Sequence, residues 1–239
     1  QFAYRLSNAP ATEITHVITG VTFPTYSKLQ DETHQLREVF FKTVQVTTFV
    51  SFPMALGIMV VAPVFVRTFL GIQWLPMVRT MQILAVWGFL RSLGATMGPV
   101  WRAVGRPDYL TKLQGLRVAL MAILIYPVAI RFGIEGVAGM IVVMSVFPLL
   151  PLDIYLIVRT IDTTVTRFLH EIAYPMVASV AMALAVLLTR ESFALHSGPD
   201  AFALLVVVGV STYLVTVGVF TTTLDWDIGE NVRTIIGTI

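Results

Sequence analysis

Residues 44–70 read VQVTTFVSFPMALGIMVVAPVFVRTFL and contain one charged side chain, Arg67. A helix of about twenty apolar residues is long enough to cross the roughly 30 Å hydrocarbon core of a bilayer. Six stretches of this kind follow one another at short intervals between residues 44 and 223. The pattern predicts an integral membrane protein.

The composition of the whole chain supports this prediction. Apolar residues make up 56% of it, the mean hydropathy is +0.81, and charged residues account for only 13%, against about 25% in an average soluble protein. We predict an all-α fold: a polytopic transmembrane bundle of about seven helices that forms a single domain over residues 1–239. The expected helices are 1–27, 44–70, 76–104, 110–132, 134–158, 169–189 and 201–223.

Several classes of function lack their sequence signals. The chain has no cysteine, its four histidines are scattered, and it contains neither a phosphate-binding glycine loop nor a nucleophile elbow. We therefore expect no enzyme activity, no cofactor and no metal site, and the net charge of +2 gives no reason to expect a nucleic acid partner. Because Gln1 lies inside a predicted helix, we expect an N-terminal part to precede it.

Lysine and arginine are distributed unevenly over alternate loops, which predicts the orientation. One set of loops carries ten, namely Lys28, Arg37, Lys42, Arg102, Arg106, Lys112, Arg117, Arg159, Arg167 and Arg233. The other set carries only Arg67, Arg79, Arg131 and Arg190. Since cytoplasmic loops retain positive charge, we expect the first set and the C-terminus to lie in the cytoplasm.

The first predicted helix has a polar stripe along its whole length. At about 100° per residue, one face collects Arg5, Asn8, Thr12, Thr15, Thr19, Thr22 and Tyr26, with His16 at its border. A stripe of this kind on a membrane helix is expected to line water or a polar cavity. The alternative is an amphipathic helix at the membrane surface, although such helices usually carry many basic residues.

Arg91 lies near the middle of its predicted span. A cation at that depth costs about 2.5–3.5 kcal/mol on insertion scales, so it needs compensation. Gly88, Ser92, Ala95 and Pro99 share its helix face, and Arg102 follows on the same face. The pattern indicates a wall facing an anionic ligand. A buried ion pair with Glu13 of the first helix is the alternative.

Proline also occurs inside the predicted spans, as in Pro53 and Pro63. Each proline removes a backbone donor and tends to kink its helix. Kinked bundles suit transporters that rock between states, but proline is also commoner in membrane helices in general.

The order of many short motifs resembles the polysaccharide exporter and O-antigen flippase (Wzx-like) family of the MOP transporter superfamily. The resemblance rests on YRLSNAPAT (4–12), VTFPTYSKLQD (21–31), PMALG (53–57), APVFV (62–66), WLP (74–76), LRSL (90–93), GRP (105–107) and GIEGVA (133–138). It extends from residue 1 to about residue 158. In that family two six-helix lobes face each other across a cationic cavity, and this chain would correspond to the C-terminal lobe.

The resemblance implies a flippase of the cytoplasmic membrane that moves a polyprenyl-pyrophosphate-linked oligosaccharide to the outer leaflet. Arg5, Arg91, Arg102 and Arg117 would neutralise the pyrophosphate, while Asn8, Thr12, Thr15, Thr19 and Ser92 would bind sugar hydroxyls. Glu13 and His16 would couple transport to an ion gradient. Expected partners are membrane lipid, the lipid-linked oligosaccharide and a polysaccharide polymerase.

Two other functions remain open at this point. A multidrug exporter of the same superfamily would need acidic residues in its cavity for cationic ligands, and Glu13 is the candidate. A membrane-embedded glycosyltransferase or polymerase would need a long extramembrane loop with paired carboxylates, and the loops of this chain are short.

Overall fold

The computed structural model describes residues 22–195 and 197–223. Residues 22–28 are helical, and they are followed by α2 (Thr33–Phe65), the π-helical turn η1 (Val66–Leu70) and the 3-10 turn η2 (Ile72–Trp74). Next come α3 (Met77–Ala103), α4 (Pro107–Met144), the π-helical turn η3 (Ser145–Leu149), α5 (Leu150–Thr160), α6 (Val165–Ser192) and α7 (Pro199–Thr223). The described part contains no strand, so the predicted all-α fold is confirmed.

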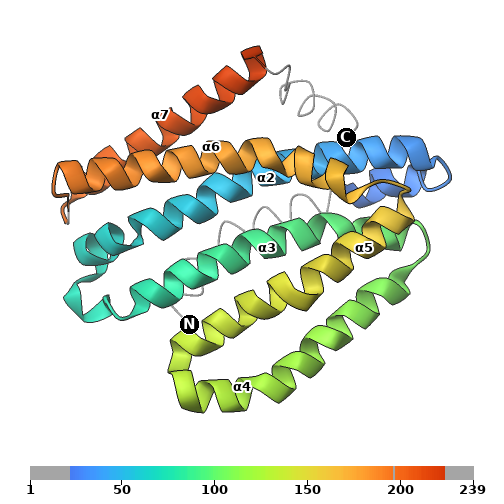
Figure 1. Cartoon of the computed structure of the whole chain (residues 1–239), viewed down its shortest axis with the longest axis horizontal. Coiled ribbons are helices and arrows are strands. Elements are labelled where there is room, and N and C mark those ends of the chain that lie inside the picture. Colours follow the sequence, from blue (N-terminus) through green and yellow to red (C-terminus); the bar gives the residue numbers. More distant parts are fainter. Residues whose placement is uncertain (1–21, 196, 224–239) are drawn as a thin grey trace.

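Among the described residues, five helical segments are long and apolar enough to cross a membrane. One of them, Pro107–Thr160, has 54 residues, which at 1.5 Å per residue is far longer than the roughly 30 Å hydrocarbon core. The chain reverses inside it at Gly133, whose φ of 62° and ψ of −153° leave the helical region. The segment therefore descends and returns as two antiparallel spans (Figure 1). The predicted boundary between 110–132 and 134–158 falls at this glycine.

The start of α2 differs from the sequence prediction. The helix begins at Thr33, well before the predicted start at residue 44. Hydropathy marks where a helix enters lipid, whereas the polar first turns of α2 are helical because Leu36, Phe40 and Phe41 are buried in the core. These side chains pack with Leu93, Met97 and Trp101 of α3 and Phe168 of α6.

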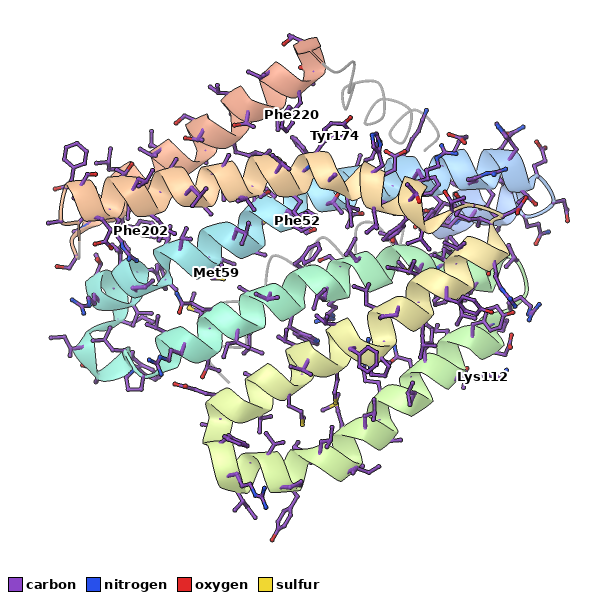
Figure 2. The ribbon with its side chains drawn as sticks, viewed as in Figure 1. Phe52, Met59, Lys112, Tyr174, Phe202 and Phe220 are labelled. Atoms are coloured by element: carbon purple, nitrogen blue, oxygen red, sulfur yellow. The ribbon has the colours of Figure 1, made fainter. Side chains whose placement is uncertain are left out.

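α2 is the central helix, because it packs against α3 on one side and against α6 and α7 on the other. Phe52 of α2 stacks on Phe89 of α3 with ring centroids 3.9 Å apart (Figure 2). On the other side, Phe49 lies against Tyr213 of α7, with centroids 5.4 Å apart. α4 and α5 pack beyond α3, so α3 separates them from α2.

At two prolines inside α2, side chains from neighbouring helices donate the hydrogen bonds that the backbone lacks. Pro53 and Pro63 have no N–H, so the carbonyls of Phe49 and Met59, four residues earlier, lose their usual helical donor. The Tyr213 hydroxyl donates to the Phe49 carbonyl at 2.7 Å, and the Gln82 side-chain amide donates to the Met59 carbonyl at 2.7 Å. Each proline therefore leaves a backbone carbonyl of α2 that accepts a hydrogen bond from another helix.

We expect Tyr213→Phe to lower the stability of the protein by about 0.6–1.7 kcal/mol, the range for hydrogen bonds between membrane helices. The substitution leaves the Phe49 carbonyl without this donor in an apolar environment. Thermal unfolding in detergent measures the change, and Tyr126→Phe, at a tyrosine that is 74% exposed, is the control. In a Pro53→Ala background, which restores the backbone donor, the cost of Tyr213→Phe should shrink. An equal cost in both backgrounds would contradict the assignment.

Candidate functional site

Three of the predicted arginines line one cavity of about 250 Å³. Arg91 and Arg102 reach it from α3, and Arg117 reaches it from the first half of α4. The remaining walls are η3 and the start of α5. Two helices that follow one another along the chain, α3 and α4, thus bring three guanidinium groups to one space.

The face of α3 explains the shape of the cavity. Arg91 and Arg102 are eleven residues apart, which is close to three helical turns, so they lie on the same face. Between them, Gly94, Ala95 and Gly98 line the cavity. A Cβ atom added at Gly94 would meet no heavy atom within 4 Å. The small side chains therefore leave room beside the arginines.

Two of the three guanidinium groups lie against aromatic rings. Arg91 lies 5.6 Å from the ring centroid of Trp87, and Arg102 lies 5.4 Å from that of Phe23. The Nε atom of Arg117 is buried and has no hydrogen-bond partner among the residues that the structure describes. Within the same residues, none of the three arginines has a carboxylate within 4.0 Å. The predicted alternative partner of Arg91, Glu13, lies outside the described residues.

The chemistry of the lining favours an anionic ligand. Guanidinium groups bind phosphate and carboxylate oxygens through paired hydrogen bonds, and they keep their charge when buried. The volume of about 250 Å³ is below the roughly 300–1,000 Å³ of sites for drug-sized molecules. The cavity is therefore suited to a compact anionic group, such as a phosphate or pyrophosphate, and is too small for an oligosaccharide.

The other predicted site residues are placed differently. Ser92 does not line the cavity, because its side chain is fully buried and its hydroxyl donates to the carbonyl of Gly88 at 3.1 Å. Arg5, Asn8, Thr12, Glu13, Thr15, His16 and Thr19 lie outside the described residues. Their roles in binding and coupling stay predictions.

The structure adds residues that the sequence interpretation did not select. Gln114 of α4, Ser145 of η3 and Asp153 of α5 also line the cavity. Asp153 carries the only carboxylate among the lining residues that the structure describes. The signal for it was present in the sequence, since an ionisable residue inside an apolar span is a functional candidate by default.

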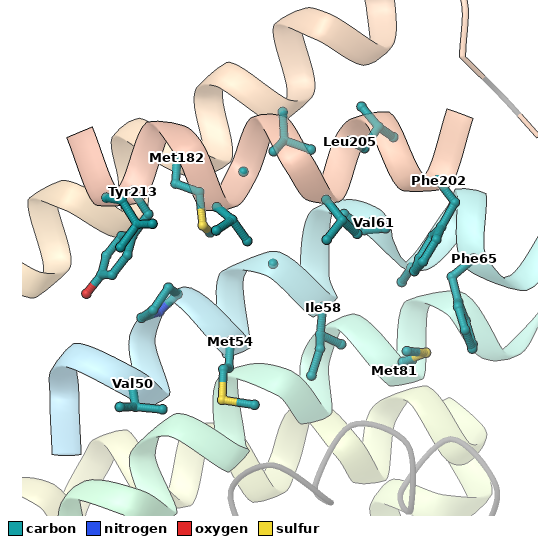
Figure 3. A pocket seen from close by; sticks show the side chains of 18 of the residues that line it. Val50, Met54, Ile58, Val61, Phe65, Met81, Met182, Phe202, Leu205 and Tyr213 are labelled. Atoms are coloured by element: carbon teal, nitrogen blue, oxygen red, sulfur yellow. The ribbon is translucent and has the colours of Figure 1, made fainter. Parts of the chain in front are cut away.

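A second cavity has a different chemistry. It has a volume of about 610 Å³ and lies between α2, α6 and α7, with Met81 of α3 at one side. Figure 3 shows Met54, Val61, Met182, Phe202 and Leu205 around it. The lining contains no charged residue, and the hydroxyl of its one tyrosine, Tyr213, donates to the backbone of α2. This cavity can hold hydrocarbon but offers little to a polar ligand.

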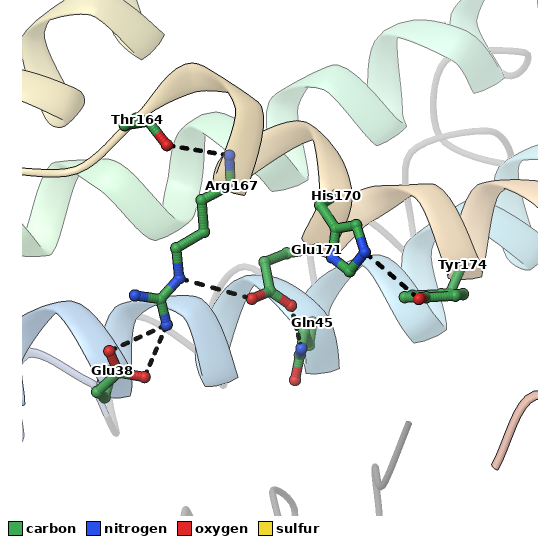
Figure 4. Close-up of polar contacts among 7 residues, drawn as sticks. All are labelled: Glu38, Gln45, Thr164, Arg167, His170, Glu171 and Tyr174. Carbon is green, nitrogen blue, oxygen red and sulfur yellow. Dashed lines mark hydrogen bonds and ion pairs between the residues drawn. The ribbon is translucent and has the colours of Figure 1, made fainter. Parts of the chain in front are cut away.

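A polar cluster joins α2 to α6 at the end of the bundle where the lysine- and arginine-rich loops lie (Figure 4). Arg167 donates to both carboxylate oxygens of Glu38, at 3.0 and 2.8 Å, and lies 3.8 Å from Glu171. Glu171 in turn accepts from the side-chain amide of Gln45. Because these charges are paired with one another, the cluster fastens the two helices and leaves no free cation for a ligand.

Metal binding has no candidate in residues 22–195 and 197–223, where no group of three histidine or acidic side chains could hold an ion. The fold and the cationic cavity together define a multi-pass helical membrane protein with a site suited to an anion.

Comparison with known proteins shows similarity to proteins of polysaccharide biosynthesis. The family model described as polysaccharide biosynthesis protein matches residues 1–79. The lipopolysaccharide biosynthesis protein WzxC of Escherichia coli (strain K12) is 36% identical over 118 residues, which cover 49% of this chain and 24% of WzxC. The teichuronic acid biosynthesis protein TuaB of Bacillus subtilis (strain 168) is 27% identical over 198 residues, which cover 82% of this chain and 41% of TuaB.

A third relative is a Klebsiella pneumoniae protein described as an uncharacterized membrane protein in the cps region, 26% identical over 216 residues, which cover 90% of this chain and 44% of that protein. No solved structure matches the chain significantly. The chain spans less than half the length of each of these curated relatives. Together the matches support the polysaccharide exporter and flippase family that the motifs predicted.

The cavity beside Arg91 should contain water, and cysteine labelling can test this. In a cysteine-free background, Ala95→Cys should react with a water-soluble thiol reagent at least about tenfold faster than Ser92→Cys, because thiolate formation requires solvent. Ala95 lines the cavity, whereas Ser92 on the same helix is 0% exposed. Leu188→Cys, on the outer surface of α6, is the lipid-facing control. Equal rates at positions 92 and 95 would show that the cavity is closed to water.

Proposed function

We propose that the protein carrying this chain moves a polyprenyl-pyrophosphate-linked oligosaccharide repeat unit across the cytoplasmic membrane for surface polysaccharide synthesis. The observation that carries the proposal is the cavity on which Arg91, Arg102 and Arg117 converge inside membrane-spanning segments. The names of WzxC and TuaB support the link to surface polysaccharides. Because the chain spans less than half of its relatives, the proposal concerns the whole protein.

In this proposal the three arginines receive the pyrophosphate. Its charge is the part of the substrate that lipid solvates worst, and guanidinium groups provide charge-assisted hydrogen bonds that lipid cannot. The oligosaccharide exceeds the volume of the cavity, and its hydroxyls are the proposed ligands of Asn8, Thr12, Thr15 and Thr19, while Arg5 is a further candidate cation for the pyrophosphate. Glu13 and His16 are the proposed ion-coupling residues. Ser92 is not included, since its hydroxyl bonds to its own helix.

The orientation of the bundle follows from its charges. The ends of α3 and α5 and the starts of α2, α4 and α6 lie at one end of the molecule (Figure 1), and the described loops there carry the larger set of lysines and arginines. We propose that this end faces the cytoplasm. The arginines would then meet the pyrophosphate nearer the leaflet in which it is made, and a polysaccharide polymerase would be the partner at the opposite face.

The two alternatives receive less support from the cavity. A multidrug exporter for cationic ligands would need an excess of carboxylates, but the described lining has three guanidinium groups and one carboxylate. An enzyme would need a nucleophile or an acid–base pair at the site. Asp153 stands there without a second carboxylate or a histidine in the described lining. We therefore propose a transporter without enzyme activity.

Arg91→Ala in the full-length protein should reduce surface polysaccharide by about 10- to 100-fold, because hydrogen bonds to charged groups contribute roughly 1.5–3 kcal/mol. Polymer on the cell surface is quantified and normalised to the amount of folded protein in the membrane. Arg131→Ala removes an exposed arginine near the reversal at Gly133, outside the cavity, and should leave export unchanged. Normal export by Arg91→Ala would remove this residue from the site.

Filling the cavity provides a test that leaves every charge in place. Gly94→Leu directs a side chain into space where a Cβ meets nothing within 4 Å, so the helix should tolerate it while the ligand loses its room. Export should fall, with protein stability equal to or above that of the wild type, because leucine favours helix more than glycine does. Gly218→Leu, in equally open space on α7, is the control. Full export by Gly94→Leu would show that the substrate does not use this cavity.

A further inference from the structure

Asp153 is a carboxylate in a cavity whose other charged lining residues, among those that the structure describes, are the three arginines. It lies in the first turn of α5, just after the helix is interrupted at Phe147, whose φ of −147° and ψ of 121° are extended. The interruption and the reversal at Gly133 bring this turn back beside α3 and the start of α4. Asp153 consequently shares one space with Arg91, Arg102 and Arg117.

Asp153 has no evident role in holding the fold together. It has no cation within 4.0 Å and no side-chain hydrogen bond in the part of the chain that the structure describes. The nearby Arg159, on the same helix, stacks on Tyr155 with its guanidinium carbon 4.6 Å from the ring centroid. Arg117 lines the same cavity as Asp153, and its Nε atom is buried and has no described hydrogen-bond partner. Each group is therefore near the other without being bound to it.

Resting on the proposed function, we infer that Asp153 is an internal counterion that competes with the anionic head group of the substrate for Arg117. Three guanidinium groups without a carboxylate would hold a pyrophosphate tightly, and a transporter must also release it. Sites that pass an ion must bind it well enough to admit it and weakly enough to let it leave. The long side chain of Arg117 can turn toward the ligand when the cavity is filled and toward Asp153 when it is empty.

This role makes Asp153 a positioning residue that sets affinity by opposing the ligand. Removing its charge should strengthen ligand binding, which is the reverse of what loss of a ligand-contacting residue would do. A purely structural role would weaken binding or leave it unchanged. The sign of the effect therefore distinguishes the proposal from both alternatives.

The test uses the purified full-length protein and geranyl pyrophosphate, a short polyprenyl pyrophosphate, with affinity measured by isothermal titration calorimetry. Asp153→Asn should bind the probe about tenfold more tightly, equivalent to about 1.4 kcal/mol, and release it more slowly in stopped-flow experiments. Asp153→Glu keeps the charge and should behave as the wild type. Asp108→Asn removes a carboxylate that pairs with Lys112 at 3.2 Å outside the cavity, and should have no effect. Geraniol, which lacks the pyrophosphate, is the ligand control.

A double-mutant cycle shows whether the effect acts through Arg117. Arg117→Gln alone should weaken binding, and Asp153→Asn should then tighten it far less than it does beside the intact arginine, because interacting residues are not additive. If Asp153→Asn increases the affinity for geranyl pyrophosphate as much in the Arg117→Gln background as in the wild type, Asp153 does not compete for Arg117. Unchanged or weaker binding by Asp153→Asn would overturn the inference as a whole.

The outcomes also separate this inference from the proposed function. If the wild type binds geranyl pyrophosphate but not geraniol, and arginine variants bind it less well, the cavity is an anion site whatever Asp153 does. In that case, an unchanged affinity of Asp153→Asn for geranyl pyrophosphate contradicts only the counterion role. If the wild type does not bind geranyl pyrophosphate, both proposals are wrong.

Discussion

The hydrocarbon core of a membrane contains no water to solvate a polar group, so each such group must find a partner within the protein or its ligand. In this chain the backbone meets that requirement in detail. The carbonyls that lose their donors at Pro53 and Pro63 receive hydrogen bonds from Tyr213 and Gln82 of other helices. The charges of Glu38, Arg167 and Glu171 meet one another. Against this background, three arginines that line a cavity and have no carboxylate within 4.0 Å among the described residues indicate a site for a ligand.

α3 connects the packing of the bundle to this site. One of its faces, with Leu93, Thr96 and Met97, is buried in the bundle. Its other face presents Arg91 and Arg102 to α4 and α5 across small residues. A single helix can do both because residues separated by whole turns stay on the same side. The cavity is thus a product of ordinary helix packing, with glycine and alanine in place of larger side chains.

Two cavities of the bundle differ in chemistry. The cationic one lies between α3, α4 and α5, and the apolar one lies between α2, α6 and α7. α2 and α3 pack together between them. A substrate that joins a charged group to a long hydrocarbon chain has the same two parts, which agrees with the lipid-linked substrate proposed above. The apolar cavity by itself says little about specificity, since any lipid chain could enter it.

Much of this protein could be read from the sequence. Hydropathy gave the membrane spans, including a boundary between two of them at residue 133, and helical periodicity placed Arg91 and Arg102 on one face. These are local properties, fixed by the side chains within one helix. The tertiary structure decided which helices meet: it brought Arg117 and Asp153 to the same cavity, turned Ser92 into the core, and supplied partners for the proline-freed carbonyls. Such contacts depend on how each helix is rotated and where the chain turns back, and residues far apart in sequence carry no local signal of them.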